Sequence, residues 1–345
     1  MRPKIPVAVW GAPDPMSQYL LAALADHPWV QLDVLLTDPD HAGRRYGESS
    51  VWSIPLPPPD GLATQVLRAY DADFSSPVVL VASCDHVPEE FVAHWLREGR
   101  RVITNQVAWG LRPEVPLIVP EINADHYALT EQQLEWSGRI IACPQPAATA
   151  LALVIGPFIR EMPLERLDGM HVCSFVDRGC PSPDEMSQTF GLTARLLPDP
   201  TPLRQVAKVL GWFAQTHIGD YMLNGCWHRS GPQLFWTVQV LARIQTTSAL
   251  AVDRLQAEWK AAHIPEFVQQ LPTTPASPWI RVHTQRTTGL WQCHAWWPPD
   301  MGVDVFLGDA ASDWVWLMID VDARARGGAF SVIHVTELSL WLDPV

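Results

Sequence analysis

Short apolar segments alternate with helical patterns over the first 105 residues, and this alternation constrains the fold more than any other feature of the chain. Residues 7–10 and 78–82 are apolar runs of strand length, and residues 30–36 and 101–104 are further strand-like segments. Between them, a helical spacing of leucines ends near His27, and residues 89–98 predict a further helix. Because strands that alternate with helices form a parallel sheet covered on both faces, we expect an α/β domain here.

The pattern changes after about residue 165, where strand-like segments follow one another. They lie at residues 171–176, 235–244, 280–284, 291–297 and 303–307, with helices expected at 203–215 and 251–263. This order favours an α+β domain with a mostly antiparallel sheet. Residues 331–342 mix apolar and polar residues, and their periodicity does not distinguish helix from strand.

Composition excludes several classes of function. The formal net charge is −13 with only 24 Lys and Arg, and nucleic-acid or anionic-membrane surfaces need clustered positive charge. There is no apolar run of about 18 residues and no signal-peptide pattern, so we expect a cytoplasmic protein without a membrane segment. The six cysteines include no C-x-x-C pair, and reduced thiols are therefore expected. Cys226-Trp227-His228 and Cys293-His294 lack zinc-site spacing, so no metal is expected.

Four sequence segments resemble landmarks of one enzyme family. They are Ala25-Asp26-His27-Pro28-Trp29, residues 42–48 (AGRRYGE), residues 115–126 (VPLIVPEINADH) and residues 271–275 (LPTTP). In this order they are similar to aspartate-semialdehyde dehydrogenases of the archaeal and fungal branch, which includes a malonyl-CoA reductase. The resemblance implies a Rossmann-like first domain (1–145 with 328–345, the C-terminal segment returning to it) and a dimerisation and substrate domain (146–327). It also implies a homodimer.

Family members form a thioester on a cysteine and use a histidine as acid and base, and the resemblance places both positions on other residues here. The nucleophile position falls on Pro146 within Cys143-Pro144-Gln145-Pro146, and the histidine position falls on Leu250. Proline has no nucleophilic group and lacks the backbone N–H that could serve an oxyanion hole. Leucine cannot transfer a proton. No catalytic residue is therefore assigned.

The glycine-rich turn that binds the dinucleotide in the family is also altered. It reads Gly11-Ala12-Pro13-Asp14, with two of three glycines replaced. Those glycines let the backbone approach the pyrophosphate, and Asp14 would bring a negative charge close to the phosphates. The basic residue that follows Thr104-Asn105 in the family is absent from Val107–Gly110. We therefore expect no cofactor, with NADP(H) binding as the alternative.

Several residues could be remnants of a site. By the same resemblance, Arg243, Asp177 and Arg178 face the former substrate pocket, where they form either an anion site or an ion pair. Cys143 and Cys180 are either relocated reactive thiols or ordinary buried ones. Trp291, Trp296 and Trp297 alternate with polar residues and predict sheet core or a subunit interface.

The joint changes at nucleophile, acid–base group and cofactor loop predict a pseudoenzyme. The expected role is that of a non-catalytic scaffold, regulatory subunit or partner, as a homodimer or in a hetero-complex with an active enzyme. Three alternatives stay open. The chain could carry out altered chemistry in the old cleft, act as an NADP-dependent semialdehyde dehydrogenase or acyl-CoA reductase despite the missing cysteine, or bind nucleotide as a sensor.

Overall fold

The computed structural model has two compact units that alternate along the chain. It describes residues 3–11, 14–83, 86–159, 164–173, 197–198, 201–211, 217–225, 237–246, 252–276, 278–283, 297–311 and 313–345. The first unit comprises Met1–Gln145, Glu266–Thr274 and Gly327–Val345, and the second comprises Pro146–Pro265 and Pro275–Arg326. The short segment Glu266–Thr274 thus lies in the first unit, although the sequence had placed it in the second.

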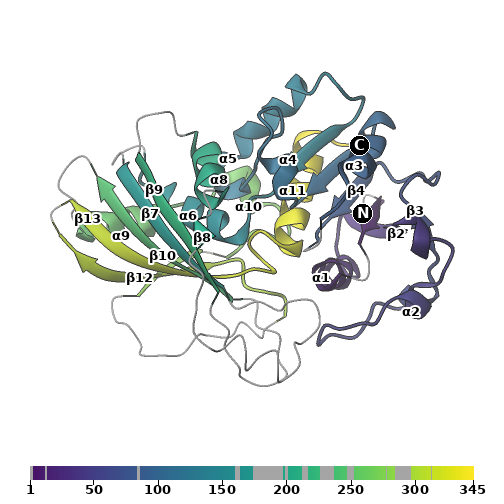
Figure 1. Ribbon diagram of the computed structural model, residues 1–345, viewed down its shortest axis with the longest axis horizontal. Helices are drawn as coiled ribbons and strands as arrows, with labels where there is room; N and C mark the ends of the chain where they lie inside the picture. The colour runs from purple at the N-terminus through teal and green to yellow at the C-terminus, as the bar shows by residue number, and fades with distance from the viewer. Residues whose placement is uncertain are drawn as a thin grey trace. The chain divides into compact units, whose positions relative to one another are not determined.

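The first unit is built on a six-stranded sheet in the order β3-β2-β1-β4-β5-β6, in which all neighbouring strands are parallel (Figure 1). The predicted parallel α/β domain is confirmed. β3 and β6 were not predicted. The strands are β1 (Ile5–Trp10), β2 (Val30–Thr37), β3 (Leu67–Ala69), β4 (Val78–Val81), β5 (Arg101–Thr104) and β6 (Arg139–Ala142).

Helices connect these strands. The expected helices are present as α1 (Pro15–Leu24) and α3 (Glu89–Arg97). Trp10 of β1 packs against Phe91 and Trp95 of α3. The remaining helices of this unit are η1 (Pro39–His41), α2 (Tyr46–Ser49), η2 (Leu62–Thr64), α4 (Val107–Gly110), α5 (Pro120–Asn123), η3 (Ala124–Gln132), α10 (Glu266–Gln269) and α11 (Ala329–Leu342).

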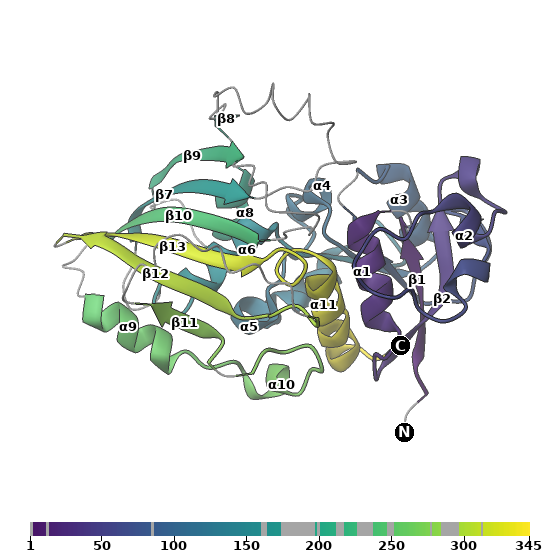
Figure 2. The same cartoon turned by 90° about the horizontal axis from the view of Figure 1, so that it is seen from below.

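The ambiguous segment near the C-terminus is the helix α11, which packs against α1, α5 and β5 (Figure 2). Its residues from Ala329 to Leu340 are all buried. A helix that is buried on every side shows no polar face and hence no helical periodicity. This complete burial explains why the sequence pattern did not reveal the helix.

The buried side chains of His27 and Glu337 join α11 to the amino edge of the sheet. His27 Nε2 lies 2.7 Å from Glu337 Oε1, and Thr273 donates to the same carboxylate from its backbone N (3.0 Å) and its hydroxyl (2.5 Å). His27 Nδ1 accepts the backbone N–H groups of Trp29 and Val30, so Nε2 carries the proton and donates. The network joins three segments that are far apart in the sequence.

A second group of contacts holds the end of α11 to the same edge. Arg101, at the start of β5, donates to the carbonyl of Ser339 at 3.2 Å and to the Asp343 carboxylate at 2.6 Å. His334 donates to the hydroxyl of Thr274 at 2.8 Å, because that hydroxyl gives its own proton to the Val268 carbonyl. The C-terminal helix is therefore an integral part of the first unit.

The second unit contains a mixed sheet in the order β11-β12-β13-β10-β7-β9-β8. Four of its pairings are antiparallel, and β11–β12 and β7–β9 are parallel, which confirms the predicted mostly antiparallel sheet. β8, β9 and β13 were not predicted. The strands are β7 (Leu164–Cys173), β8 (Leu197–Pro198), β9 (His217–Gly225), β10 (Thr237–Thr246), β11 (Ile280–His283), β12 (Val303–Ala310) and β13 (Trp314–Asp322).

Among the described residues of this unit, three helices pack on the sheet: α6 (Pro146–Ile155), α8 (Thr201–Leu210) and α9 (Val252–Ala261). α6 contacts β10, β12, β13 and α8, and α9 contacts β11. Trp259 of α9 donates its indole N–H to the carbonyl of Val154 in α6 at 2.8 Å. α6 was not predicted, whereas α8 and α9 were. Residues 291–296 of the predicted strand 291–297 lie outside the described residues.

Candidate functional site

The connections of the first unit define where a ligand would bind. From the neighbouring strands β1 and β4 the chain proceeds outward in opposite directions, to β2 and β3 on one side and to β5 and β6 on the other. In open α/β sheets, ligands bind outside the carboxyl ends of the strands at such a switch point. Here that position lies between Gly11, after β1, and Ser83, after β4. Of the predicted loop Gly11-Ala12-Pro13-Asp14, Ala12 and Pro13 lie outside the described residues.

Asp14 occupies the N-cap of α1 at this switch point. Its Oδ1 accepts the backbone N–H of Met16 at 2.7 Å and that of Ser17 at 3.4 Å, and its Oδ2 accepts the hydroxyl of Ser83 at 3.0 Å. The residue is only 8% exposed. Asp followed by Pro is a strong helix-start signal, so the sequence could have revealed this cap. The bond to Ser83, 69 residues away, had no sequence signal.

The surroundings of the cap are closely packed. The Ser17 hydroxyl lies 2.7 Å from the Ala82 carbonyl and 3.1 Å from that of Trp10. Gly11 adopts φ of 80°, and a Cβ at this position would lie 3.2 Å from the Ser17 oxygen. Only glycine fits this backbone without strain. The described residues at this switch point therefore require glycine at position 11.

Amide side chains complete the same edge of the sheet. Asn105 accepts the backbone N–H of Ser83 at 3.1 Å, and Gln106 donates to the Ser83 carbonyl at 3.2 Å while accepting the N–H of Val87 at 3.1 Å. The four residues of α4, where the resemblance places a basic residue, include no Lys or Arg. The described part of this edge thus presents a carboxylate, hydroxyls and amides.

Pro146 is the first residue of α6. Proline suits this position because its fixed φ is helical and its missing N–H would have no partner within the helix. Pro146 therefore favours the start of the helix. Cys143 lies three residues earlier, is 1% exposed and donates its backbone N–H to Thr104 at 2.7 Å. Burial raises the pKa of its thiol well above the usual range, which disfavours a reactive thiolate.

Arg243 of β10 lies between Asp168 of β7 and Trp316 of β13 in the sheet register. Its guanidinium carbon is 5.1 Å from the centre of the Trp314 ring, and the described residues include no hydrogen-bond partner for its buried Nε. Asp168 is paired with Arg166 at 2.8 Å. Asp177, Arg178, Cys180 and Leu250 lie outside the described residues, so the predicted remnant site is represented here by Arg243 alone.

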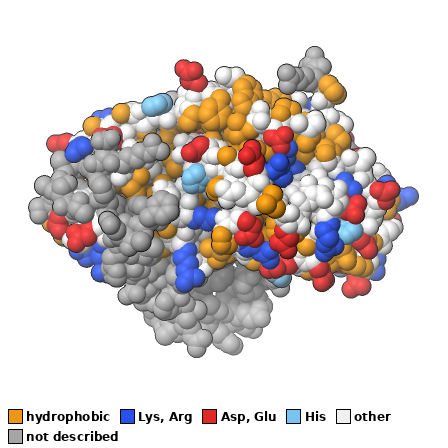
Figure 3. Space-filling view, turned by 90° about the horizontal axis from the view of Figure 1, so that it is seen from above, with side chains coloured by type: hydrophobic (Ala, Val, Ile, Leu, Met, Phe, Trp, Pro, Cys, Tyr) orange, Lys and Arg blue, Asp and Glu red, His pale blue; other side chains and the backbone are white. Residues whose placement is uncertain are grey.

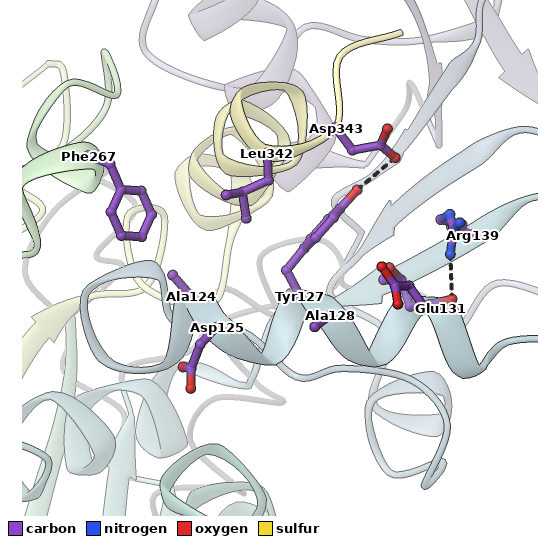
Figure 4. A pocket seen from close by; sticks show the side chains of 10 residues that line it. Ala124, Asp125, Tyr127, Ala128, Glu131, Arg139, Phe267, Leu342 and Asp343 are labelled. Carbon is purple, nitrogen blue, oxygen red and sulfur yellow. Dashed lines mark hydrogen bonds between the residues drawn. The ribbon is translucent and has the colours of Figure 1, made fainter.

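A cavity of about 440 Å³ opens beside the amino edge of the first sheet (Figure 4). Tyr127 points toward Asp343 across it, with 3.3 Å between the phenol oxygen and the carboxylate. Arg139 donates to the backbone of Thr130 at 2.7 Å. The cavity lies at the opposite edge from the switch point. It is lined by Ala124, Asp125, Tyr127, Ala128, Thr130, Glu131, Arg139, Phe267, Leu342 and Asp343.

Three further observations concern the surface charge, the length of the helices and the arrangement of possible metal ligands among the described residues. On the face in Figure 3, Lys and Arg side chains lie among Asp and Glu side chains. None of the described helices is both long and apolar enough to span a bilayer. Within the same described ranges, no group of three or more His, Cys, Asp or Glu side chains is arranged to hold a metal ion.

The first unit thus has an open parallel sheet with a switch point, the architecture of dinucleotide-binding folds, beside a second unit with a mixed sheet. Residues 6–130 match the family described as "Semialdehyde dehydrogenase, NAD binding domain". The predicted resemblance is therefore confirmed for this part of the chain.

The relatives found by sequence are enzymes. An aspartate-semialdehyde dehydrogenase of Archaeoglobus fulgidus is 29% identical over 161 residues, which cover 44% of this chain and 46% of that protein. A malonyl CoA reductase (NADP) of Metallosphaera sedula is 26% identical over 170 residues, 47% of this chain and 46% of that protein. The chain thus matches about half the length of these curated relatives.

Solved structures extend the likeness to the whole fold. The structure of aspartate semialdehyde dehydrogenase with NADP from Candida albicans superposes with a TM-score of 0.79 and covers 99% of this chain and 100% of that one. The sequence identity is 15%, so this likeness concerns the fold.

Proposed function

We propose that this protein has the fold of an aspartate-semialdehyde dehydrogenase but does not carry out the thioester chemistry of such enzymes, and acts as a non-catalytic scaffold, regulatory subunit or partner. The observation that carries the proposal is that α6 begins at Pro146, the residue on which the family resemblance places the nucleophile. A proline ring has no lone pair that could attack a carbonyl carbon. Cys143, the nearest thiol along the chain, is buried and has a raised pKa.

The cofactor site gives independent support. The matching family is NAD-binding, which does not support the expectation that no cofactor binds. In this chain, however, the α1 N–H groups that face a pyrophosphate in such folds are engaged by the Asp14 carboxylate. The residues at this edge do not fit a dinucleotide bound in the usual way, and we assign no hydride-transfer step.

Turnover assays test the proposal. The purified protein is incubated with aspartate semialdehyde, phosphate and NADP⁺, and separately with malonyl-CoA and NADPH, while absorbance of the reduced cofactor is followed. The Archaeoglobus fulgidus relative serves as the positive control for the first reaction, and the Metallosphaera sedula enzyme for the second. We expect rates at least about a thousandfold below these controls, as for enzymes without their nucleophile. Rates within about tenfold of a control would overturn the proposal.

We further propose a homodimer through the second unit. One face of its sheet carries the half-buried side chains of Trp314, Trp316 and Met318, with Phe306 beside Met318 in the register. Aromatic residues of this kind are enriched where subunits meet. Native mass spectrometry of the protein from its own host would show a mass of twice 38.5 kDa or a larger hetero-complex with an active enzyme. A monomer alone would contradict both assemblies.

Arg243 favours one alternative function, an altered reaction or ligand site in the old substrate region. A cation whose Nε has no hydrogen-bond partner among the described residues is suited to bind a carboxylate or phosphate. If this alternative holds, Arg243→Ala abolishes the binding of a co-purifying anionic metabolite, and Arg243→Lys keeps part of it. Equal ligand content in the wild type and in Arg243→Ala would exclude it.

A further inference from the structure

The N-terminus of α1 is the position in the first unit with the strongest physical attraction for an anion. Its first backbone N–H groups have no partner within the helix, and the helix dipole places partial positive charge there. α1 has 10 residues and begins directly after the turn that follows β1. In dinucleotide-binding folds this helix end receives the pyrophosphate.

In this chain the same N–H groups already donate to an anion. The Asp14 carboxylate accepts from Met16 and Ser17, and Ser83 closes it from the neighbouring strand end. The residue is 8% exposed, so its charge is largely removed from water. Its two oxygens thus accept three hydrogen bonds, two from backbone N–H groups of α1 and one from the hydroxyl of Ser83.

A phosphate group at this helix end would meet two obstacles. Its oxygens would compete for N–H groups that Asp14 occupies, and its charge would lie next to a buried carboxylate of the same sign, which costs free energy in a poorly solvated place. The space beside Gly11 is also narrow, since a Cβ there would lie 3.2 Å from Oγ of Ser17 and 3.7 Å from Oγ of Ser83.

We infer that the Asp14 carboxylate is an internal substitute for the phosphate of a dinucleotide, so that this chain blocks its own cofactor site with a single side chain. The switch point and the positive φ of Gly11 are present in this chain. The blocking group is the side chain of Asp14, which the backbone conformation does not require. The inference goes beyond the proposed function, because an inactive homologue could still bind NADP(H).

The test is a gain of binding. NADPH binding is measured by fluorescence titration and by the shift of the melting temperature for the wild type, Asp14→Ser and Asp14→Gly. Serine keeps an N-cap oxygen and glycine is well tolerated at this position, so both variants are expected to fold. Asp253→Asn is the matched control, because Asp253 is an exposed acid in the first turn of α9 in the second unit.

We expect both Asp14 variants to bind NADPH at least about tenfold more tightly than the wild type, and Asp253→Asn to behave as the wild type. Inorganic pyrophosphate should compete with NADPH in the variants. The inference is overturned if Asp14→Ser and Asp14→Gly bind NADPH no more tightly than the wild type does. This result would not alter the turnover assays, so failure here is distinguishable from failure of the proposed function.

Discussion

The two edges of the parallel sheet both contain a buried carboxylate, but the two carboxylates are held in different ways. At the amino edge, Glu337 of α11 binds His27 and Thr273, which come from distant parts of the chain. At the carboxyl edge, Asp14 binds two N–H groups of its own helix and one hydroxyl from the neighbouring strand end. The first network holds segments together, whereas the second mainly completes a helix end.

This difference between the two edges explains why the landmarks of the family resemblance predict the fold. Two of its landmarks, residues 25–29 and 271–275, supply the partners of Glu337 at the amino edge. They are needed to bury α11, whatever reaction the protein performs. The resemblance places the family's cofactor turn and nucleophile elsewhere, on segments that contain Asp14 and Pro146 in this chain. A resemblance that rests on such landmarks predicts the fold better than the activity.

The largest expected effect is the loss of the Glu337 carboxylate. Glu337→Ala leaves the buried Nε2–H of His27 and two donors of Thr273 without an acceptor, and each buried donor left without an acceptor costs about 1–3 kcal/mol. Urea denaturation measures the free energy of unfolding. Exposed Glu135 provides the control, and Glu135→Ala should change stability by less than about 0.5 kcal/mol. Equal stability of Glu337→Ala and Glu135→Ala would mean that the Glu337 network does not stabilise the amino edge, and the distinction between the two edges of the sheet would be lost.

The second unit offers a carboxylate held in a third way, with a stability that depends on pH. Burial alone would raise the pKa of Asp304, but hydrogen bonds from Arg281 and His283 outweigh burial and hold the pKa below its usual range. Asp304→Asn should lower stability by about 2 kcal/mol at neutral pH, as expected for hydrogen bonds to a charged group.

The pH dependence of this difference has a definite sign. A depressed carboxylate pKa contributes stability above the unfolded-state pKa of about 4, and this contribution is lost as the pH falls through the folded-state pKa. The gap between wild type and Asp304→Asn should therefore be constant between about pH 5 and 7 and shrink below about pH 4. Denaturation curves at several pH values measure it, and a gap that widens in acid would show that the ionised form is not the stabilising one.

The sequence predicted those parts of the fold in which one face of an element is polar or an apolar run has clear ends. It identified β5 to the residue, because Arg101–Thr104 is a short apolar run between polar segments. It missed β13, where Trp314, Trp316 and Met318 make the second face apolar as well and conceal the alternation. It missed α6 for a related reason, since Ala147–Ile155 is buried throughout.

The candidate site was predicted only as far as local chemistry reaches. Asp14 and Pro146 could be singled out because an acid at a phosphate-binding turn and a proline at a nucleophile position conflict with the chemistry expected there. Asp14 accepts a hydrogen bond from Ser83, 69 positions away, and the carbonyl of Ser83 accepts one from Gln106, 23 positions away. Such contacts depend on the completed sheet, so no local pattern in the sequence encodes them.

A smaller effect is expected from the carboxyl edge. Asp14→Ala removes an N-cap and should destabilise the protein by about 1 kcal/mol, whereas Asp14→Ser should cost clearly less because its hydroxyl can accept the same N–H bonds. Urea denaturation alongside Glu337→Ala compares the two edges in one experiment. A loss for Asp14→Ala as large as that for Glu337→Ala would mean that the bond to Ser83 joins the strand ends as strongly as α11 is joined to the amino edge.

The smallest effect concerns Tyr127, whose phenol lies near Asp343 at the amino edge. The contact of 3.3 Å is long for a hydrogen bond between oxygens, so Tyr127→Phe should cost only about 0.5 kcal/mol at neutral pH. Burial raises the pKa of Tyr127 to about 12, with Arg101 opposing this shift and Asp343 adding to it. The unfolded chain ionises this group near pH 10.

Between about pH 10 and 12 the unfolded state therefore releases a proton that the folded state keeps, and stability falls as the pH rises. Phenylalanine removes this loss, so Tyr127→Phe should be less destabilised than the wild type on going from pH 9 to 11. Denaturation at these pH values, with absorbance at the tyrosinate band, measures both quantities. If the two proteins lost stability equally, Tyr127 would ionise as an exposed tyrosine does, and the amino edge would be open to water at this point.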